Sequence, residues 1–181
     1  YGNTIPYKSV PSEKGYTFSE WDGYTQGMKM PAKDLDFVSE KTTNSYSILY
    51  FVDGEFWAEK LYKYQEAIEP LEYFKEGYNV SEWKPTLPEK MPYYNLSAYC
   101  TTEVMRYNVI FVDENGNTVS EAKGVPYNTP IIDIIPLVEE GYSYTITSVD
   151  VNETVKDNMT IVGKLSINEY KVTIICGETQ T

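Results

Sequence analysis

Hydrophobic and polar positions alternate with a period of two in several short stretches of this chain. One such stretch, residues 46–52, runs through Asp53-Gly54 into a second, residues 55–63. Alternation of this kind predicts half-buried strands, and an Asp-Gly or Asn-Gly pair between them predicts a hairpin closed by a type I′ turn. The same pattern predicts a second hairpin, formed by residues 107–112 and 118–123 around Asn115-Gly116.

Each predicted hairpin is followed by about a dozen residues that end at a glycine. Residues 67–75 precede Gly77, and residues 131–140 precede Gly141. Such a segment is long enough for a short helix or an irregular crossover, and the glycine is suited to end it. After Gly77, two further strands are predicted. A hairpin, a crossover and two strands form a β-grasp-like α+β arrangement. The two later strands are expected at residues 78–83 and 95–101.

The chain also repeats itself over longer distances. Tyr1, Tyr64 and Tyr127 are 63 positions apart, each has an Ile four places on, and each precedes a Gly-Tyr pair by 13 or 14 residues. The first two copies continue alike, with Trp21 and Trp83 at one position. In the third copy Thr147 is expected at the Trp position, and Met159 at the position of the methionine in Met30-Pro31 and Met91-Pro92.

Periodicity of this kind predicts tandem repeat units of about sixty residues. Small units with nearest-neighbour contacts are expected to form an elongated array rather than one globule. The expected fold class is α+β, mostly β, with β-grasp-like units. The boundaries are residues 1–43 for a partial unit that lacks the opening hairpin, 44–102 and 103–167 for two repeat units, and 168–181 for the first strand of a further unit.

These motifs resemble the Listeria–Bacteroides repeat family, which includes the B-repeat of internalin B. The resemblance rests on Tyr-x-(Val/Ile)-x-(Phe/Tyr), Gly-Tyr-x-(Phe/Val)-x-x-Trp and Met-Pro, and it weakens in the third copy, which lacks the Trp. It implies a β-grasp-like module of a bacterial cell-surface or secreted protein, anchored to the cell wall or outer membrane through another part of the polypeptide. It implies no catalytic residues.

Composition excludes some partners. The net charge of −12 opposes binding to nucleic acid and to anionic membranes. No apolar run approaches the roughly 18–20 residues of a membrane span. The 18 tyrosines favour strands and contact surfaces. We therefore expect a monomer that binds no nucleic acid, does not insert into a membrane through this segment, and takes a host or matrix protein or a surface glycan as its partner.

The chain contains no histidine, so the usual hydrolase triads and zinc sites lack their base or ligand. Asp113 to Asn117 resembles a calcium loop, but the positions of Gly116 and Gly124 fit a hairpin turn better. Cys100 and Cys176 are expected as small apolar strand residues, with a disulfide as the alternative. We expect a protein that is not an enzyme and has no cofactor and no metal.

Three aromatic residues are the candidate ligand-binding residues: Trp57, Tyr93 and Tyr94. Counting back from Tyr64 and Tyr127 aligns Trp57 with Ser120. If Phe56 faces the core, strand alternation places Trp57 on the opposite face, where it could stack on a sugar or enter a partner's pocket.

Each of these aromatic residues has an alternative reading. Trp57 could instead pack against the adjacent unit or the crossover. The Tyr93-Tyr94 pair fits a contact patch or an ordinary turn. Trp21 and Trp83 are expected to fill the core of their units, with exposed ligand contacts as the alternative.

The sequence thus favours a non-catalytic bacterial cell-surface repeat module that serves as a stalk, in adhesion or in protein interaction. Two alternatives stay open. One is a carbohydrate-binding module, which would use the aromatic-rich surface. The other is an accessory domain of a larger surface enzyme.

Overall fold

The computed structural model describes residues 1–174, and within them the architecture is mostly β, as expected. This described part contains no α-helix, and therefore no helix long and apolar enough to cross a membrane. The chain divides into two compact units. One comprises Tyr1–Tyr73 with Val80–Thr102, and the other comprises Phe74–Asn79 with the chain from Glu103 onward.

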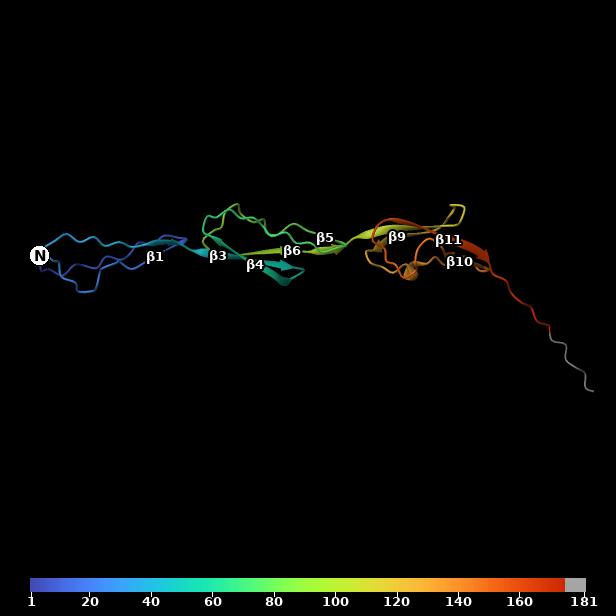
Figure 1. Ribbon diagram of the computed structural model, residues 1–181, viewed down its shortest axis with the longest axis horizontal. Helices are drawn as coiled ribbons and strands as arrows, with labels where there is room; N and C mark the ends of the chain where they lie inside the picture. Colours follow the sequence, from blue (N-terminus) through green and yellow to red (C-terminus); the bar gives the residue numbers. More distant parts are fainter. Residues whose placement is uncertain (175–181) are drawn as a thin grey trace, which may run out of the picture. The chain divides into compact units, whose positions relative to one another are not determined.

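The first unit contains a three-stranded sheet of order β4-β3-β6 (Figure 1). Strands β3 and β4 form the predicted antiparallel hairpin, and β6 returns parallel to β3 after the crossover. Asp53 and Gly54 both have positive φ, 52° and 89°, so the type I′ turn is confirmed. The strand bounds are Ser45–Val52 for β3, Glu55–Lys63 for β4 and Leu96–Cys100 for β6.

The second unit contains a four-stranded sheet of order β10-β11-β8-β9. Strands β8 and β9 form the second hairpin, and β11 runs parallel to β8 and antiparallel to β10. The connectivity of hairpin, crossover and parallel return is therefore the same in both units. The strand bounds are Arg106–Val112 for β8, Thr118–Pro126 for β9, Tyr142–Ile146 for β10 and Met159–Ile167 for β11.

The turn of this second hairpin differs from the prediction. Asn115 does not have positive φ, and only Gly116 does, at 85°. The type I′ assignment was therefore wrong, because Asp113 and Asn117 close a longer, three-residue loop through a backbone bond of 2.9 Å. The Asp113 carboxylate stabilises this loop by accepting from the amides of Asn115 and Asn117 and from the Asn117 side chain.

The crossovers form little regular structure. Residues 67–75 contain no helix, and residues 131–140 contain only the 3-10 turn η1, Ile131–Ile134. Pro70 in the first, and Pro130 and Pro136 in the second, lack the amide that a continuous helix requires. Two short sheets complete the described structure. They pair β1, Tyr16–Phe18, with β2, Lys41–Thr43, and β5, Tyr78–Val80, with β7, Thr102–Val104.

A small hydrophobic core lies between the sheet and the crossover in each hairpin-containing segment. In residues 44–102 the fully buried side chains include Ile48, Tyr50 and Met91. In residues 103–167 the corresponding core contains Val109, Phe111, Ile131, Val155 and Ile161.

A repeated backbone hydrogen-bond pattern holds each crossover in place. The Gln65 amide donates to Met91 at 2.9 Å, and the Asn128 amide donates to Val155 at 2.7 Å. Residues 1–43 contain the same bond, from the Gly2 amide to Met30 at 2.8 Å. Val155, rather than Met159, therefore takes the methionine position in the third copy. Met159 is instead the first residue of β11, opposite Val109 in β8.

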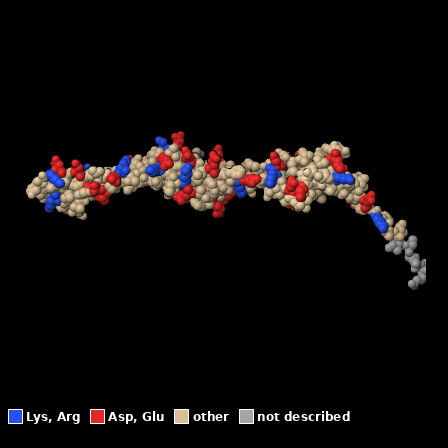
Figure 2. All heavy atoms as spheres, in the orientation of Figure 1, with Lys and Arg blue, Asp and Glu red and all other residues tan. Residues whose placement is uncertain are grey.

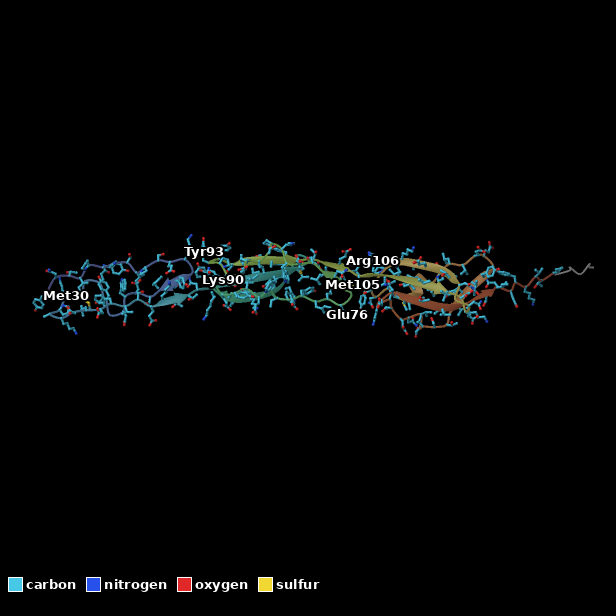
Figure 3. All side chains as sticks on the ribbon, turned by 90° about the horizontal axis from the view of Figure 1, so that it is seen from above. Met30, Glu76, Lys90, Tyr93, Met105 and Arg106 are labelled. Carbon is cyan, nitrogen blue, oxygen red and sulfur yellow. The ribbon has the colours of Figure 1, made fainter. Side chains whose placement is uncertain are left out.

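Two of the recurring tyrosines, Tyr64 and Tyr127, pack over glycines. The Tyr64 ring lies over Gly15, and the Tyr127 ring lies over Gly77, so closely that a Cβ at either glycine would overlap the ring. The Tyr127 hydroxyl also donates to the Glu76 carboxylate at 2.6 Å. Its amide donates to Met105, which Figure 3 labels together with Glu76. Tyr64 and Tyr127, two of the three tyrosines spaced by 63 residues, thus make the same ring-on-glycine contact, whereas Tyr1 is exposed.

The end of the chain is only partly described. The strand expected over residues 168–181 is not formed in residues 168–174, which have no strand partner among the described residues. An alternating sequence needs such a partner to become a strand. Its remainder, which includes Cys176, lies outside the described residues, whereas Cys100 is buried in β6.

Candidate functional site

Trp57 lies at an irregularity in β4. Tyr50 pairs with Ala58 and Phe51 pairs with Phe56, so Trp57 is an extra residue with no partner of its own across the hairpin. A β-bulge of this kind interrupts the alternation of side chains along the strand. The expected assignment of faces was therefore wrong, because it assumed unbroken alternation. Phe56 is 59% exposed, and Trp57 turns toward the side of the core.

Four aromatic rings meet on that side. The Trp57 ring stacks on Trp83 at 6.0 Å between centroids and meets Tyr73 of the crossover edge-on at 5.1 Å. Trp83 also lies 4.9 Å from the Tyr50 ring. Trp57 keeps 38% of its surface exposed. The structure thus includes the crossover contact that was the alternative for Trp57, and it leaves one side of the indole accessible.

The tryptophan of the repeat also binds backbone. The Trp83 indole N–H donates to the Leu71 carbonyl at 2.7 Å, and the Trp21 indole N–H donates to the Lys8 carbonyl at 2.6 Å. Both bonds tie the crossover to the segment that follows the Gly-Tyr pair. Trp83 packs against the buried core of residues 44–102, as expected for a residue that fills the unit.

Tyr50 lies at the centre of this cluster. It is fully buried, and its hydroxyl has no hydrogen-bond partner within the described residues. Burial, reinforced by the nearby Tyr62 hydroxyl, raises the pKa of Tyr50 to about 12. The phenol therefore stays neutral at physiological pH and contributes packing, not charge.

A second aromatic group lies on the opposite face of the same sheet, and sequence reasoning missed it. Phe51 stacks on Tyr99 at 5.0 Å with 17° between the ring planes, and Phe56 meets Phe51 at 6.0 Å. Tyr99 is 48% exposed. The alternation of side chains would have placed the rings of Phe51, Phe56 and Tyr99 on one face if the bulge at Trp57 had been known. No feature of the sequence indicates that bulge.

Tyr93 and Tyr94 follow the crossover at some distance in sequence from Trp57. Both are exposed, and their rings meet edge-on at 5.5 Å. The Lys14 ammonium lies 4.7 Å from the centre of the Tyr93 ring and donates to its hydroxyl at 3.3 Å. No ring contact joins this pair to Trp57 within the described residues, so the three predicted residues do not form one aromatic cluster.

The charge distribution is mixed. Figure 2 shows acidic and basic side chains interspersed on the visible face. No group of three or more Cys, Asp or Glu side chains in residues 1–174 is arranged to hold a metal ion. The titratable groups with shifted pKa values are mainly tyrosines that are buried or bonded to a carboxylate, such as Tyr127 beside Glu76.

Comparison with known proteins gives a partial match. The chain is 34% identical over 88 residues to internalin H of Listeria monocytogenes serovar 1/2a (strain ATCC BAA-679 / EGD-e), which covers 44% of this chain and 16% of that protein. No family model matches the chain. The aligned region thus spans less than a fifth of the length of this relative, and the similarity indicates an internalin-like relationship over part of the chain.

Proposed function

We propose that this chain is a non-catalytic interaction module of a bacterial cell-surface or secreted protein, built from tandem β-grasp-like repeats. The observation that carries the proposal is the recurrence of one backbone pattern with different side chains around it. An enzyme needs one set of reacting groups, whereas a repeated frame with a varying surface suits spacing and binding. Similarity to internalin H supports a surface role.

The proposed repeat boundaries follow the recurring hydrogen bonds. The Asn95 side chain accepts from the Ser47 amide at 2.9 Å, and the Asn158 side chain accepts from the Asn108 amide at 2.8 Å. Each bond joins the start of the parallel return strand to the start of the hairpin. Residues 1–43 have Asp34 at this position and contain the crossover bonds, but they have no hairpin to complete them.

A carbohydrate-binding role is the second candidate, because of one observation. The stacked Phe51 and Tyr99 rings, with Phe56 beside Phe51, form an aromatic platform on an open sheet face, where Tyr99 and Phe56 are exposed. Exposed aromatic rings can contact the apolar surface of a sugar. Trp57 does not contribute to this platform, because it lies on the other side of the sheet.

A glycan and matrix-protein array probed with the whole chain tests both candidates. Variants Trp57→Ala and Tyr99→Ala serve as matched controls on the two faces of one sheet. A specific protein hit supports the interaction module, and a glycan hit that Tyr99→Ala removes supports the second candidate. The absence of any hit from a folded sample contradicts an adhesive role and leaves only spacing.

A further inference from the structure

The hairpin of residues 103–167 contains a bulge at the same place as that of residues 44–102. Phe111 pairs with Ser120 and Val112 pairs with Thr118, so Val119 is the extra residue. Val119 therefore corresponds to Trp57, and the expected match of Trp57 with Ser120 was wrong by one position. The large indole of one segment is replaced by a small aliphatic side chain in the other.

The other members of the aromatic cluster change as well. Leu137 lies four residues before Gly141, as Tyr73 lies four residues before Gly77. Leu137 is fully exposed, so nothing in the described chain covers it. Thr147 takes the place of Trp83. None of the three aromatic residues Trp57, Tyr73 and Trp83 has an aromatic counterpart at the matching position. One ring from another position, Tyr144, meets Phe111 edge-on at 6.1 Å.

A cavity of about 440 Å³ lies beside Val119 and Leu137, the residues that match Trp57 and Tyr73. This volume lies within the range of roughly 300–1,000 Å³ that is usual for ligand sites. Tyr142 and Leu165 on its rim are each 41% exposed. Exposed apolar side chains gathered around a concavity are typical of an interaction site. The residues that line it are Asp113, Asn117, Thr118, Val119, Leu137, Val138, Glu139, Tyr142 and Leu165.

The charged groups of the cavity are acidic. Asp113 and Glu139 line it, and no Lys or Arg of the described chain does so. The hydrogen bonds that Asp113 accepts, first from the Asn117 side chain, hold the pKa of its carboxyl below the usual range. The cavity thus combines an apolar wall with a stable negative charge at its edge.

We propose that this cavity binds an aromatic side chain of a protein partner, presented beside a Lys or Arg residue. The internal comparison identifies the occupant: in residues 44–102 the matching position is filled by the chain's own Trp57, which packs on Tyr73. In residues 103–167 a ring from outside takes that place, and its cationic neighbour pairs with Asp113 or Glu139. Rings buried in such pockets supply much of the binding energy of protein interfaces.

This inference goes beyond the proposed function because it rests on the fold and the cavity alone, without the surface location. It also differs from the Phe51 and Tyr99 platform, which lies in the other compact unit. The site belongs to a single unit, since all of its lining residues follow Glu103.

NMR titration of the whole chain with three short capped peptides, Lys-Trp-Lys, Lys-Leu-Lys and Glu-Trp-Glu, tests the proposal. We expect saturable shifts confined to the residues that line the cavity. Lys-Trp-Lys should bind at least tenfold more tightly than either of the other peptides. Equal affinity for Lys-Leu-Lys would overturn the role of the ring, and equal affinity for Glu-Trp-Glu would overturn the role of the acidic edge.

Variants distinguish binding in this cavity from non-specific binding. Val119→Trp, which copies the sister segment, should fill the cavity and weaken Lys-Trp-Lys binding at least tenfold. Leu137→Ala serves as a second variant that keeps the fold, because Leu137 is fully exposed, and it should also weaken binding. Ile132→Ala, at an exposed residue outside the cavity, should not change it.

The proposal is also contradicted by binding that survives Val119→Trp, by shifts centred on the Phe51 and Tyr99 platform, or by no binding at millimolar peptide. Self-association of the chain with shifts in the cavity would identify a second copy of the chain as the occupant. It would overturn the proposal that a different protein binds there. A glycan that competes for the cavity while Lys-Trp-Lys does not would likewise replace the peptide ligand.

Discussion

Residues 44–102 and residues 103–167 form the same backbone arrangement and fill it differently. Both have a hairpin, an irregular crossover and a parallel return strand, with an asparagine that accepts from the first strand. In the first segment Trp57, Tyr73 and Trp83 cluster over the core. In the second segment Tyr144 packs on Phe111 of the core, and a cavity with acidic groups lies beside Val119 and Leu137.

This difference shows which features determine the fold. Backbone hydrogen bonds, positive-φ glycines and the core positions recur, and they specify how the chain is arranged. The side chains beside the bulge do not recur, and they determine what the surface presents. A repeat protein can thus change its contact surface from one copy to the next without changing its fold.

The largest expected difference between the segments comes from Trp83→Ala. The variant loses the indole bond to Leu71 and the contacts with Tyr50 and Trp57, so we expect a loss of about 3–5 kcal/mol of unfolding free energy from residues 44–102. Thr147→Ala, the matched change in the other segment, should lower the unfolding free energy by much less than Trp83→Ala does. Urea denaturation followed by near-ultraviolet circular dichroism measures both. Equal losses would contradict the claim that only one segment depends on the aromatic cluster.

Two glycines give the next comparison. Gly77 and Gly141 both have positive φ, 75° and 91°, but only Gly77 lies under a tyrosine ring. Gly141→Ala should cost about 1–2 kcal/mol for the left-handed conformation. Gly77→Ala should cost about 1–3 kcal/mol more, because the new Cβ overlaps the Tyr127 ring. Thermal denaturation of the two variants measures the difference. Equal costs would mean that Tyr127 moves away freely.

The shared asparagines should respond alike. Asn95→Ala and Asn158→Ala each remove one bond to a strand amide, and we expect a loss of about 1 kcal/mol in each case. Denaturant titration of the two variants, with Asn152→Ala as a control at a turn, measures this. A large effect at one asparagine and none at the other would argue against a common frame.

The smallest expected effect concerns pH. Tyr50 is replaced by Phe111 in the other segment, which cannot ionise. Burial raises the pKa of Tyr50 from 10.0 to about 12, so its contribution to stability is complete below pH 10.0 and is lost as the pH rises through about 12. Tyr50→Phe should reduce this loss, as measured by fluorescence of Trp57 and Trp83. An unchanged alkaline transition would show that other tyrosines cause it.

The sequence predicted much of this arrangement. The hairpin strands agree closely with the alternating stretches, since β4 spans the predicted residues 55–63. Asp53-Gly54 formed its predicted turn because two positive φ angles leave little choice. Asn115-Gly116 did not form the predicted type I′ turn, because the Asp113 carboxylate stabilises a longer loop. Competition between local hydrogen bonds of this kind cannot be predicted from the dipeptide alone.

The candidate site was less predictable. The sequence singled out Trp57 as a candidate, but the predicted face was wrong because a one-residue bulge reverses the assignment for neighbouring side chains. The cavity was missed altogether. In the sequence, the cavity is indicated by the replacement of Trp57 by Val119 and of Trp83 by Thr147. The first replacement can be recognised only once Val119 is correctly matched to Trp57. An alignment by the tyrosines alone places that match one residue away.

Native-state hydrogen exchange of the whole chain, compared with its Trp83→Ala variant, tests whether the two segments share one backbone arrangement but differ in side-chain packing. We expect slow exchange in the unmodified chain for the matched amides of Met91 and Val155 and of Ile68 and Ile131, which make equivalent backbone hydrogen bonds. In the variant, Met91 and Ile68 should lose protection while Val155 and Ile131 keep it. Loss of protection at all four amides, or at none, would show that the two segments do not differ in their dependence on the aromatic cluster.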